Sequence, residues 1–258
     1  MILAIDVGNT NIVLGGIADG KQLFSARLKS DRDKTADQYA LDIQGLLMLH
    51  GVRPCDVEGG ILSSVVPYLQ SVIPEAIRLL TGVELTVVGP GIRTGLNIRM
   101  DNPSSVGSDL IVAAVAARAK YKTPIAIVDM GTATTLSVIV NDNEYVGGMI
   151  IPGLWTSLNA LSANAAQLPY IDLKGATKLL GTNTVDCMRS GAVNGTAAML
   201  DGLIDRLEDE LGEPVTPVLT GGLSGLIAPV CRRRFRLEPD ILIDGLMILY
   251  EKNRQKTE

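Results

Sequence analysis

An acid, a glycine, an amide and a hydroxyl stand together in the short polar segment that runs from Asp6 to Thr10. The glycine, Gly8, lets the backbone approach an anion closely, and backbone N–H groups can then donate to phosphate oxygens. Asn9 and Thr10 add side-chain donors, and Asp6 can hold a hard cation such as Mg²⁺, directly or through water. These groups suit a phosphate and metal site, although an ordinary polar hairpin turn is the better interpretation of one such segment alone.

The same pattern occurs a second time between Asp129 and Leu136, as an apolar run, Asp-x-Gly, small polar residues and a further apolar run. The spacing to the next turn also repeats, because 13 residues separate Asp6 from Asp19 and 13 separate Asp129 from Asp142. A repeat at long period indicates related structural units. We therefore expect two related halves, each of which offers its polar turn to a shared cleft.

The elements that position these turns can be read from the apolar pattern. Runs over 1–5 and 12–17 predict two strands, and the dipeptide Asp19-Gly20 predicts a hairpin to a third. Further strands alternate with helices, which indicates an α/β architecture. We expect an N-terminal domain over 1–118 and a C-terminal domain over 119–258, with the last helix packing on the second half or crossing back to the first. Helices are expected from Thr35 or Asp37 to His50 and over 68–81, 110–120, 185–211 and 241–253.

The composition restricts the class of protein. Hydrophobic residues make up 47% of the 258 residues, which is ample for a folded core. A net charge of -5 and an aromatic content of 3% argue against a nucleic-acid surface. The single histidine, His50, argues against a histidine-rich metal site. Three cysteines without a CxxC pair favour free thiols, and no apolar stretch reaches membrane-spanning length, so we expect a cytoplasmic protein.

Two further segments carry candidate chemistry. Asp109 lies at the start of an expected alanine-rich helix, where the ordinary role of a carboxylate is to cap the helix or to interact with its dipole. Thr220-Gly221-Gly222 follows a short strand, and its glycine pair either permits the close approach of a flat ligand or forms a tight turn. The glycine-rich segment over 89–95 lacks the Lys-Ser or Lys-Thr of a Walker loop, so we interpret it as a connecting loop.

Taken together, the motifs resemble those of the type III pantothenate kinases, which belong to the acetate and sugar kinase, Hsp70 and actin superfamily. The two Asp-x-Gly turns alone indicate the superfamily, and the other motifs make the resemblance specific. It extends over nearly the whole chain. The motifs that carry it are Asp6-x-Gly8-Asn9-Thr10, Asn102-Pro103, Gly107-Ser108-Asp109, Asp129-x-Gly131-Thr132, Gly147-Gly148-x-Ile150-x-Pro152-Gly153, Asn183-Thr184 and Thr220-Gly221-Gly222.

The resemblance implies two related actin-like (ribonuclease H-like) α/β domains with a nucleotide cleft between them. It implies a homodimer that phosphorylates pantothenate to 4'-phosphopantothenate with ATP, the first step of coenzyme A biosynthesis. It also implies Mg²⁺, which Asp6 would hold directly or through water, and a monovalent cation, K⁺ or NH₄⁺, at Asp129. Asp109 matches the catalytic base. The positions that match ATP contacts are Asp6, Val7, Gly8, Asn9, Thr10, Asn11, Ile12, Val13, Thr132, Gly221 and Gly222, and those that match pantothenate contacts are Met100, Gly107, Ser108, Asp109, Leu110 and Thr184.

Two positions depart from the pattern of the family. Leu110 stands where the family usually has arginine, and Met100 stands where it usually has tyrosine. The missing arginine removes a fixed cation that could pair with the substrate, and Arg93 and Arg99 are candidates to replace it. Two alternatives therefore stay open beside the kinase: a nucleotide-binding regulator without kinase activity, and a phosphotransferase of the superfamily with another acceptor.

Overall fold

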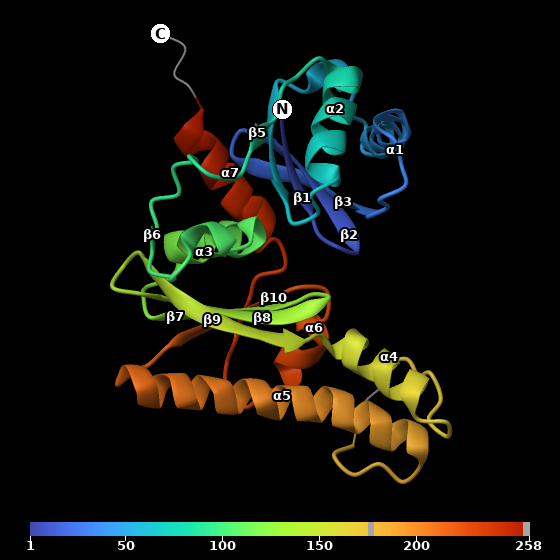
Figure 1. The fold of residues 1–258 in the computed structure, drawn as a ribbon, viewed down its shortest axis with the longest axis vertical. Coiled ribbons are helices and arrows are strands. Elements are labelled where there is room, and N and C mark those ends of the chain that lie inside the picture. Colours follow the sequence, from blue (N-terminus) through green and yellow to red (C-terminus); the bar gives the residue numbers. More distant parts are fainter. Residues whose placement is uncertain (175–177, 255–258) are drawn as a thin grey trace. The chain divides into compact units, whose positions relative to one another are not determined.

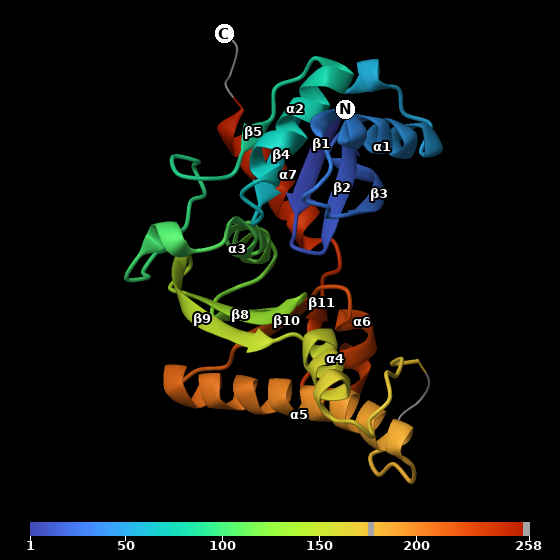
Figure 2. The ribbon, with the colours of Figure 1, turned by 45° about the vertical axis from the view of Figure 1, so that its right-hand side comes forward.

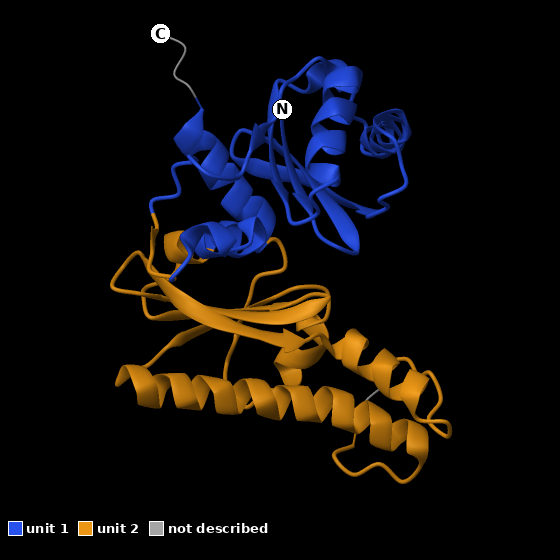
Figure 3. Ribbon diagram, in the orientation of Figure 1, with its two compact units in different colours: residues 1–95, 101–116, 241–258 blue, residues 96–100, 117–240 orange. Residues whose placement is uncertain are grey.

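Two β-sheets organise the chain, and each lies in its own compact unit (Figure 3). The computed structural model describes residues 1–174 and 178–254. Unit 1 contains residues 1–95, residues 101–116 and the chain from Ile241 onwards. Unit 2 contains residues 96–100 and 117–240. The chain therefore passes between the units more than once.

The sheet of unit 1 has five strands in the order β3-β2-β1-β4-β5. The central strand β1 pairs antiparallel with β2 and parallel with β4. Asp19 and Gly20 join β2 to β3 with φ of 50° and 70°, which confirms the predicted hairpin because such turns need positive φ at both residues. The strands are β1 (Ile2–Val7), β2 (Asn11–Ala18), β3 (Lys21–Lys29), β4 (Gly59–Ser64) and β5 (Thr86–Val87).

Helices cover both faces of this sheet (Figures 1 and 2). Alternate residues of β1, Leu3 and Ile5 among them, are fully buried in a core shared with α1 (Ala36–Leu49) and α2 (Leu69–Thr81). The opposite face receives α7 (Ile241–Asn253), whose Ile243 fills the space beside Gly15. Two short 3₁₀ segments, Pro54–Asp56 and Pro103–Ser105, and the helix α3 (Ser108–Lys120) complete this part of the chain.

The sheet of unit 2 has the order β11-β10-β7-β8-β9-β6. Alternate residues of β7, Ala126, Val128 and Met130, face a core built with the long helix α5, which runs along one face of the sheet (Figure 1). The strands are β6 (Asn97–Ile98), β7 (Ile125–Met130), β8 (Ala133–Val140), β9 (Glu144–Pro152), β10 (Thr216–Thr220) and β11 (Arg236–Leu237). The helices are α4 (Leu154–Asn164), α5 (Thr184–Leu211), α6 (Ser224–Ile227) and the 3₁₀ turn Ala228–Val230.

The two sheets repeat one topology. In each, a central strand pairs antiparallel with the next strand of the chain and parallel with a later one. Within the described residues, the second sheet differs by the addition of β6. Both also have a register shift in the outer hairpin, at Gly16/Ile17 and at Val138/Ile139. The predicted α/β fold with two related halves is confirmed. Among the described helices, none is long and apolar enough to cross a membrane.

Candidate active site

The first polar turn joins β1 to β2 and is fastened by the end of β3. The N–H of Gly8 donates to the carbonyl oxygen of Asn11 at 2.9 Å. Ser30, the residue that follows β3, holds the turn from the other side, because its hydroxyl donates to the carbonyl oxygen of Gly8 at 2.6 Å. Arg32 donates to the Oδ1 of Asn9 at 3.2 Å. A guanidinium group therefore lies beside the turn.

Asp6 lies on β1, on the face of the sheet away from the core with α1 and α2, and only 6% of its surface is exposed. Its partner on the parallel strand β4 is Ser63, which is fully buried. The hydroxyls of Ser63 and Ser108 lie 3.0 Å apart, and the Ser108 hydroxyl also donates to the carbonyl oxygen of Ser64 at 3.2 Å. The carboxyl end of β4 thus anchors the beginning of α3. Sequence reasoning missed Ser63, whose only signal was a hydroxyl at the end of a buried strand.

Asp109 lies in the first turn of α3, one residue after this anchor. Its Oδ1 accepts the N–H of Leu110 at 2.8 Å. Burial raises the pKa of the Asp109 carboxyl above its ordinary value of 3.8, and backbone N–H donors oppose part of that rise. A side chain on Gly107 would place its Cβ 2.5 Å from Oδ1, so the absence of a side chain there leaves room for the carboxylate. A carboxylate held in this way is a better proton acceptor than an ordinary aspartate.

The second polar turn joins β7 to β8 and is fastened by the beginning of α4. The N–H of Gly131 donates to the carbonyl oxygen of Ala133 at 3.1 Å. The hydroxyl of Thr156 donates to the carbonyl oxygen of Thr132 at 2.8 Å. Gly153 packs so closely on Thr132 that a Cβ would collide with its backbone. The glycine that precedes α4 is therefore required for the turn to keep its shape.

Asp129 occupies in the second sheet the place that Asp6 occupies in the first. Its partner on the parallel strand β10 is Thr220, which is 2% exposed, just as Ser63 is the partner of Asp6. Gly221 follows with φ of 90°, and a Cβ there would lie 2.5 Å from the Oδ1 of Asp129. Gly221, the first residue of the glycine pair, therefore lies very close to the carboxylate of Asp129, and only glycine permits this approach.

The remaining predicted residues lie at separate places in the chain. Met100 follows β6, with its sulfur 3.7 Å from the point where a Cβ of Gly147 would lie. Thr184 is the first residue of α5 and follows the capping residue Asn183. Arg99, a candidate to replace the family arginine, pairs with Glu144 at 3.3 Å. Unit 1 carries Asp6 to Val13 and Gly107 to Leu110, whereas unit 2 carries Met100, Asp129, Thr132, Thr184, Gly221 and Gly222.

The donor set suits cations that phosphate and water help to bind. Within residues 1–174 and 178–254, no group of three or more acidic, histidine or cysteine side chains gathers to hold a metal. Mg²⁺ in phosphate-transfer sites needs only one or two carboxylates, because phosphate oxygens and water complete its shell. Asp6 and Asp129, one in each sheet, fit that requirement.

Comparisons with known proteins agree with this arrangement. The family model of type III pantothenate kinases matches residues 2–206. A type III pantothenate kinase of Moorella thermoacetica is 44% identical over 253 residues, with 98% of this chain and 100% of the relative covered. One of Geobacter sulfurreducens is 42% identical over 256 residues, with 99% of this chain and 100% of the relative covered.

Solved structures show the fold at low sequence identity. A protein provisionally named 2-dehydro-3-deoxygalactonokinase from Sinorhizobium meliloti aligns with a TM-score of 0.59 at 13% identity, over 100% of this chain and 98% of that chain. The ethanolamine utilization protein EutJ of Carboxydothermus hydrogenoformans aligns with a TM-score of 0.55 at 16% identity, over 96% and 89%. The match of the family model, together with the full-length relatives, shows that this chain belongs to the type III pantothenate kinase family.

Proposed function

We propose that this chain transfers the γ-phosphate of ATP to the hydroxyl group of pantothenate and so forms 4'-phosphopantothenate. The observation that carries the proposal is the full-length similarity to type III pantothenate kinases, combined with both Asp-x-Gly turns and with Asp109 at its match to the catalytic base. In the proposal the product leads to coenzyme A, and the enzyme works in the cytoplasm.

The two polar turns have the groups that phosphoryl transfer needs. Such a reaction depends on alignment and on neutralisation of charge more than on covalent chemistry. In the proposal, the backbone N–H groups and side chains over 6–13 hold phosphate oxygens, and Thr132 adds a contact from the second turn. Asp6 would hold Mg²⁺, directly or through water, and Asp129 would hold K⁺ or NH₄⁺. These cations supply positive charge to the phosphates when bound, and Gly221-Gly222 lies near the adenosine.

Asp109 is the general base of the proposal. A carboxylate cannot ionise an alcohol beforehand, because an alcohol is a far weaker acid. It therefore accepts the proton late, as the oxygen of the acceptor bonds to phosphorus. Burial raises the pKa of Asp109, which makes its carboxylate a stronger base than an ordinary aspartate. The N–H of Leu110 fixes the direction of Oδ1 and so holds the carboxylate in one orientation.

The acceptor is bound, in the proposal, by Met100, Gly107, Ser108, Leu110 and Thr184. Ser108 acts mainly through its bonds to the end of β4, which fix the first turn of α3. Leu110 brings no charge to the acceptor, so recognition of the pantothenate carboxylate falls to other groups. The enzyme works as a homodimer, as the resemblance to the family implies.

Release of ADP with and without pantothenate, in the presence of Mg²⁺ and K⁺, tests the proposal. We expect release only when pantothenate is present. Release that needs a different alcohol would assign another acceptor, and release without any acceptor would indicate a nucleotide hydrolase. Absence of release under every condition would favour a nucleotide-binding regulator. Replacing K⁺ by Na⁺ should slow the reaction if Asp129 holds a monovalent cation.

A further inference from the structure

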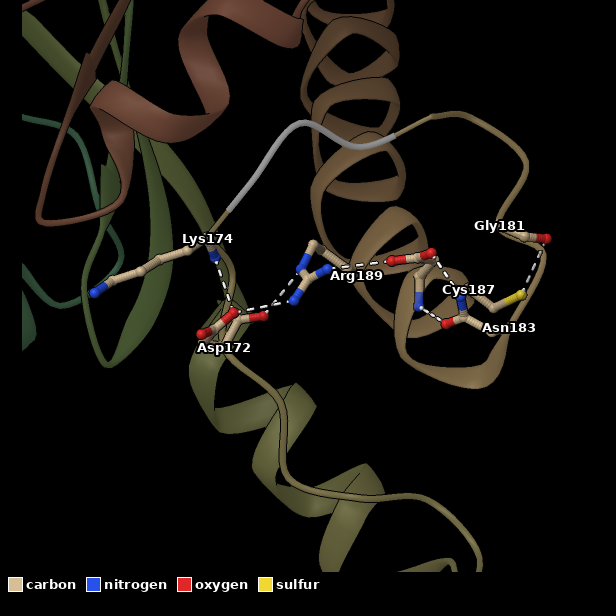
Figure 4. A network of polar contacts seen from close by, with 7 residues as sticks. Asp172, Lys174, Gly181, Asn183, Cys187 and Arg189 are labelled. Carbon is tan, nitrogen blue, oxygen red and sulfur yellow. Dashed lines mark hydrogen bonds and ion pairs between the residues drawn. The ribbon is translucent and has the colours of Figure 1, made fainter.

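Arg189 lies at the centre of a polar network near the beginning of α5 (Figure 4). Its Nη2 donates to the Oδ1 of Asp172 at 3.0 Å, and its Nε donates to the carbonyl oxygen of Asp172 at 3.2 Å. Its Nη1 donates to the Oδ1 of Asp186 at 3.2 Å. Only 18% of the arginine side chain is exposed. The guanidinium group therefore joins the segment before α5 to the first turn of the helix.

The network continues from Asp186 to the residue that caps the helix. The second carboxylate oxygen of Asp186 accepts from the Nδ2 of Asn183 at 2.7 Å, and the N–H of Asp186 donates to the Oδ1 of Asn183 at 2.9 Å. Asn183 is the N-cap of α5, and Thr184 follows it directly. A continuous set of contacts thus links Asp172, through Arg189 and Asp186, to the residue next to Thr184.

Two more side chains of α5 hold the segment that leads into the helix. The thiol of Cys187 donates to the carbonyl oxygen of Gly181 at 3.4 Å, and the hydroxyl of Ser190 donates to the carbonyl oxygen of Leu179 at 2.7 Å. Capping does not require the arginine, because Asn183 already satisfies the first turn. What Arg189 adds is a connection to Asp172, which lies 17 residues away in the chain.

We propose that Arg189 is a positioning residue that holds Thr184 in the orientation that binds the acceptor. The inference rests on the proposed function, in which Thr184 contacts pantothenate. A residue in a binding site is effective only when the groups behind it restrict its movement. Without Arg189, Asp186 and Asn183 are released from Asp172, and Thr184 samples more orientations. Because neither the phosphate turns nor Asp109 is involved, the loss affects binding of the acceptor and not the rate of the bound complex.

The test compares Arg189→Met with Thr184→Ala, singly and together, in the full chain. Methionine removes every donor and keeps the length and helix propensity of the side chain. We expect each single variant to raise the KM for pantothenate by about 3- to 10-fold, the range of one hydrogen bond. The kcat and the KM for ATP should stay within about twofold. The double variant should raise the KM by much less than the product of the two effects, because coupled residues are not additive.

Two controls separate this role from a loss of structure. Arg53→Met breaks a comparable pair with Asp56, whose arginine is 77% exposed, and should leave all kinetic constants unchanged. Asp172→Asn weakens the same network from its other end and should reproduce the rise in KM. A fall of kcat in Arg189→Met, or effects that multiply in the double variant, would overturn the inference.

The same experiment distinguishes failure of the inference from failure of the proposed function. If the native protein shows no turnover with pantothenate, or if Thr184→Ala leaves the KM unchanged, the proposed function or its assignment of Thr184 is wrong. If Thr184→Ala raises the KM while Arg189→Met does not, the inference about Arg189 is wrong and the proposed function stands.

Discussion

Gly107→Ala tests whether the position of the Asp109 carboxylate, the proposed base, controls the rate independently of the stability of the fold. The added Cβ would lie 2.5 Å from the Oδ1 of Asp109, whereas ordinary contact begins at 3.4 Å, so the carboxylate must move by about 0.9 Å. A misplacement of this size in an active site can cost about 100-fold in rate. The backbone of Gly107 is outside the left-handed region, so alanine adds no strain in φ. We expect kcat to fall by up to about 100-fold.

Stability should change little in the same variant, because the displaced atom belongs to a side chain and not to the backbone. The matched control is Gly45→Ala, on the exposed side of α1 with open space around it. It should raise the free energy of unfolding by about 0.5–1 kcal/mol without any change in kcat. Steady-state kinetics and urea unfolding measure both quantities. A Gly107→Ala protein with kcat within threefold of the native value would refute the position assigned to Asp109.

Two further predictions concern the carboxylates. Asp109→Asn should abolish turnover, spare ATP binding and raise the melting temperature at pH 7, because burial raises the pKa of Asp109 and so the fold disfavours its charge. That gain should shrink as the pH falls through the raised pKa of the folded protein and be lost below the ordinary value of 3.8, where the carboxyl is protonated in both the folded and the unfolded protein; an equal gain at pH 7 and below pH 3.8 would contradict it. Gly221→Ala should lower the free energy of unfolding by at least about 1–2 kcal/mol in urea titrations, since its φ is 90° and its Cβ would collide with Asp129, and an unchanged midpoint would be inconsistent with that contact.

Much of the fold follows from local patterns. The hairpin at Asp19-Gly20 was predictable because positive φ at two successive residues favours this dipeptide, and α7 begins at Ile241 and ends at Asn253, as its pattern predicts. The strands β6 and β11 could not be predicted, because each has only two residues and forms only by pairing with a strand that is distant in the sequence. So short a segment carries no periodicity that distinguishes it from a loop.

In the candidate site, too, local motifs could be predicted from the sequence, and contacts between distant residues could not. Both polar turns could be predicted from residue types and spacing, since each motif lies within a few consecutive positions, whereas the role proposed for Asp109 came only from the resemblance to the family. Ser63 and Arg189 could not be found in this way. Ser63 acts on Ser108, 45 residues away, and Arg189 acts on Asp172, 17 residues away. Such pairs are defined by the folded chain, and the sequence alone does not indicate which distant residue is the partner.

Transfer of the γ-phosphate from radiolabelled ATP to pantothenate tests the central claim most directly. In a single-turnover experiment with Mg²⁺ and K⁺, the native protein should move the label into 4'-phosphopantothenate. The Asp109→Asn variant should bind ATP with unchanged affinity and transfer no label. Transfer by Asp109→Asn at the native rate would contradict the role of Asp109 as the base, and absence of labelled 4'-phosphopantothenate with the native protein would contradict the account as a whole.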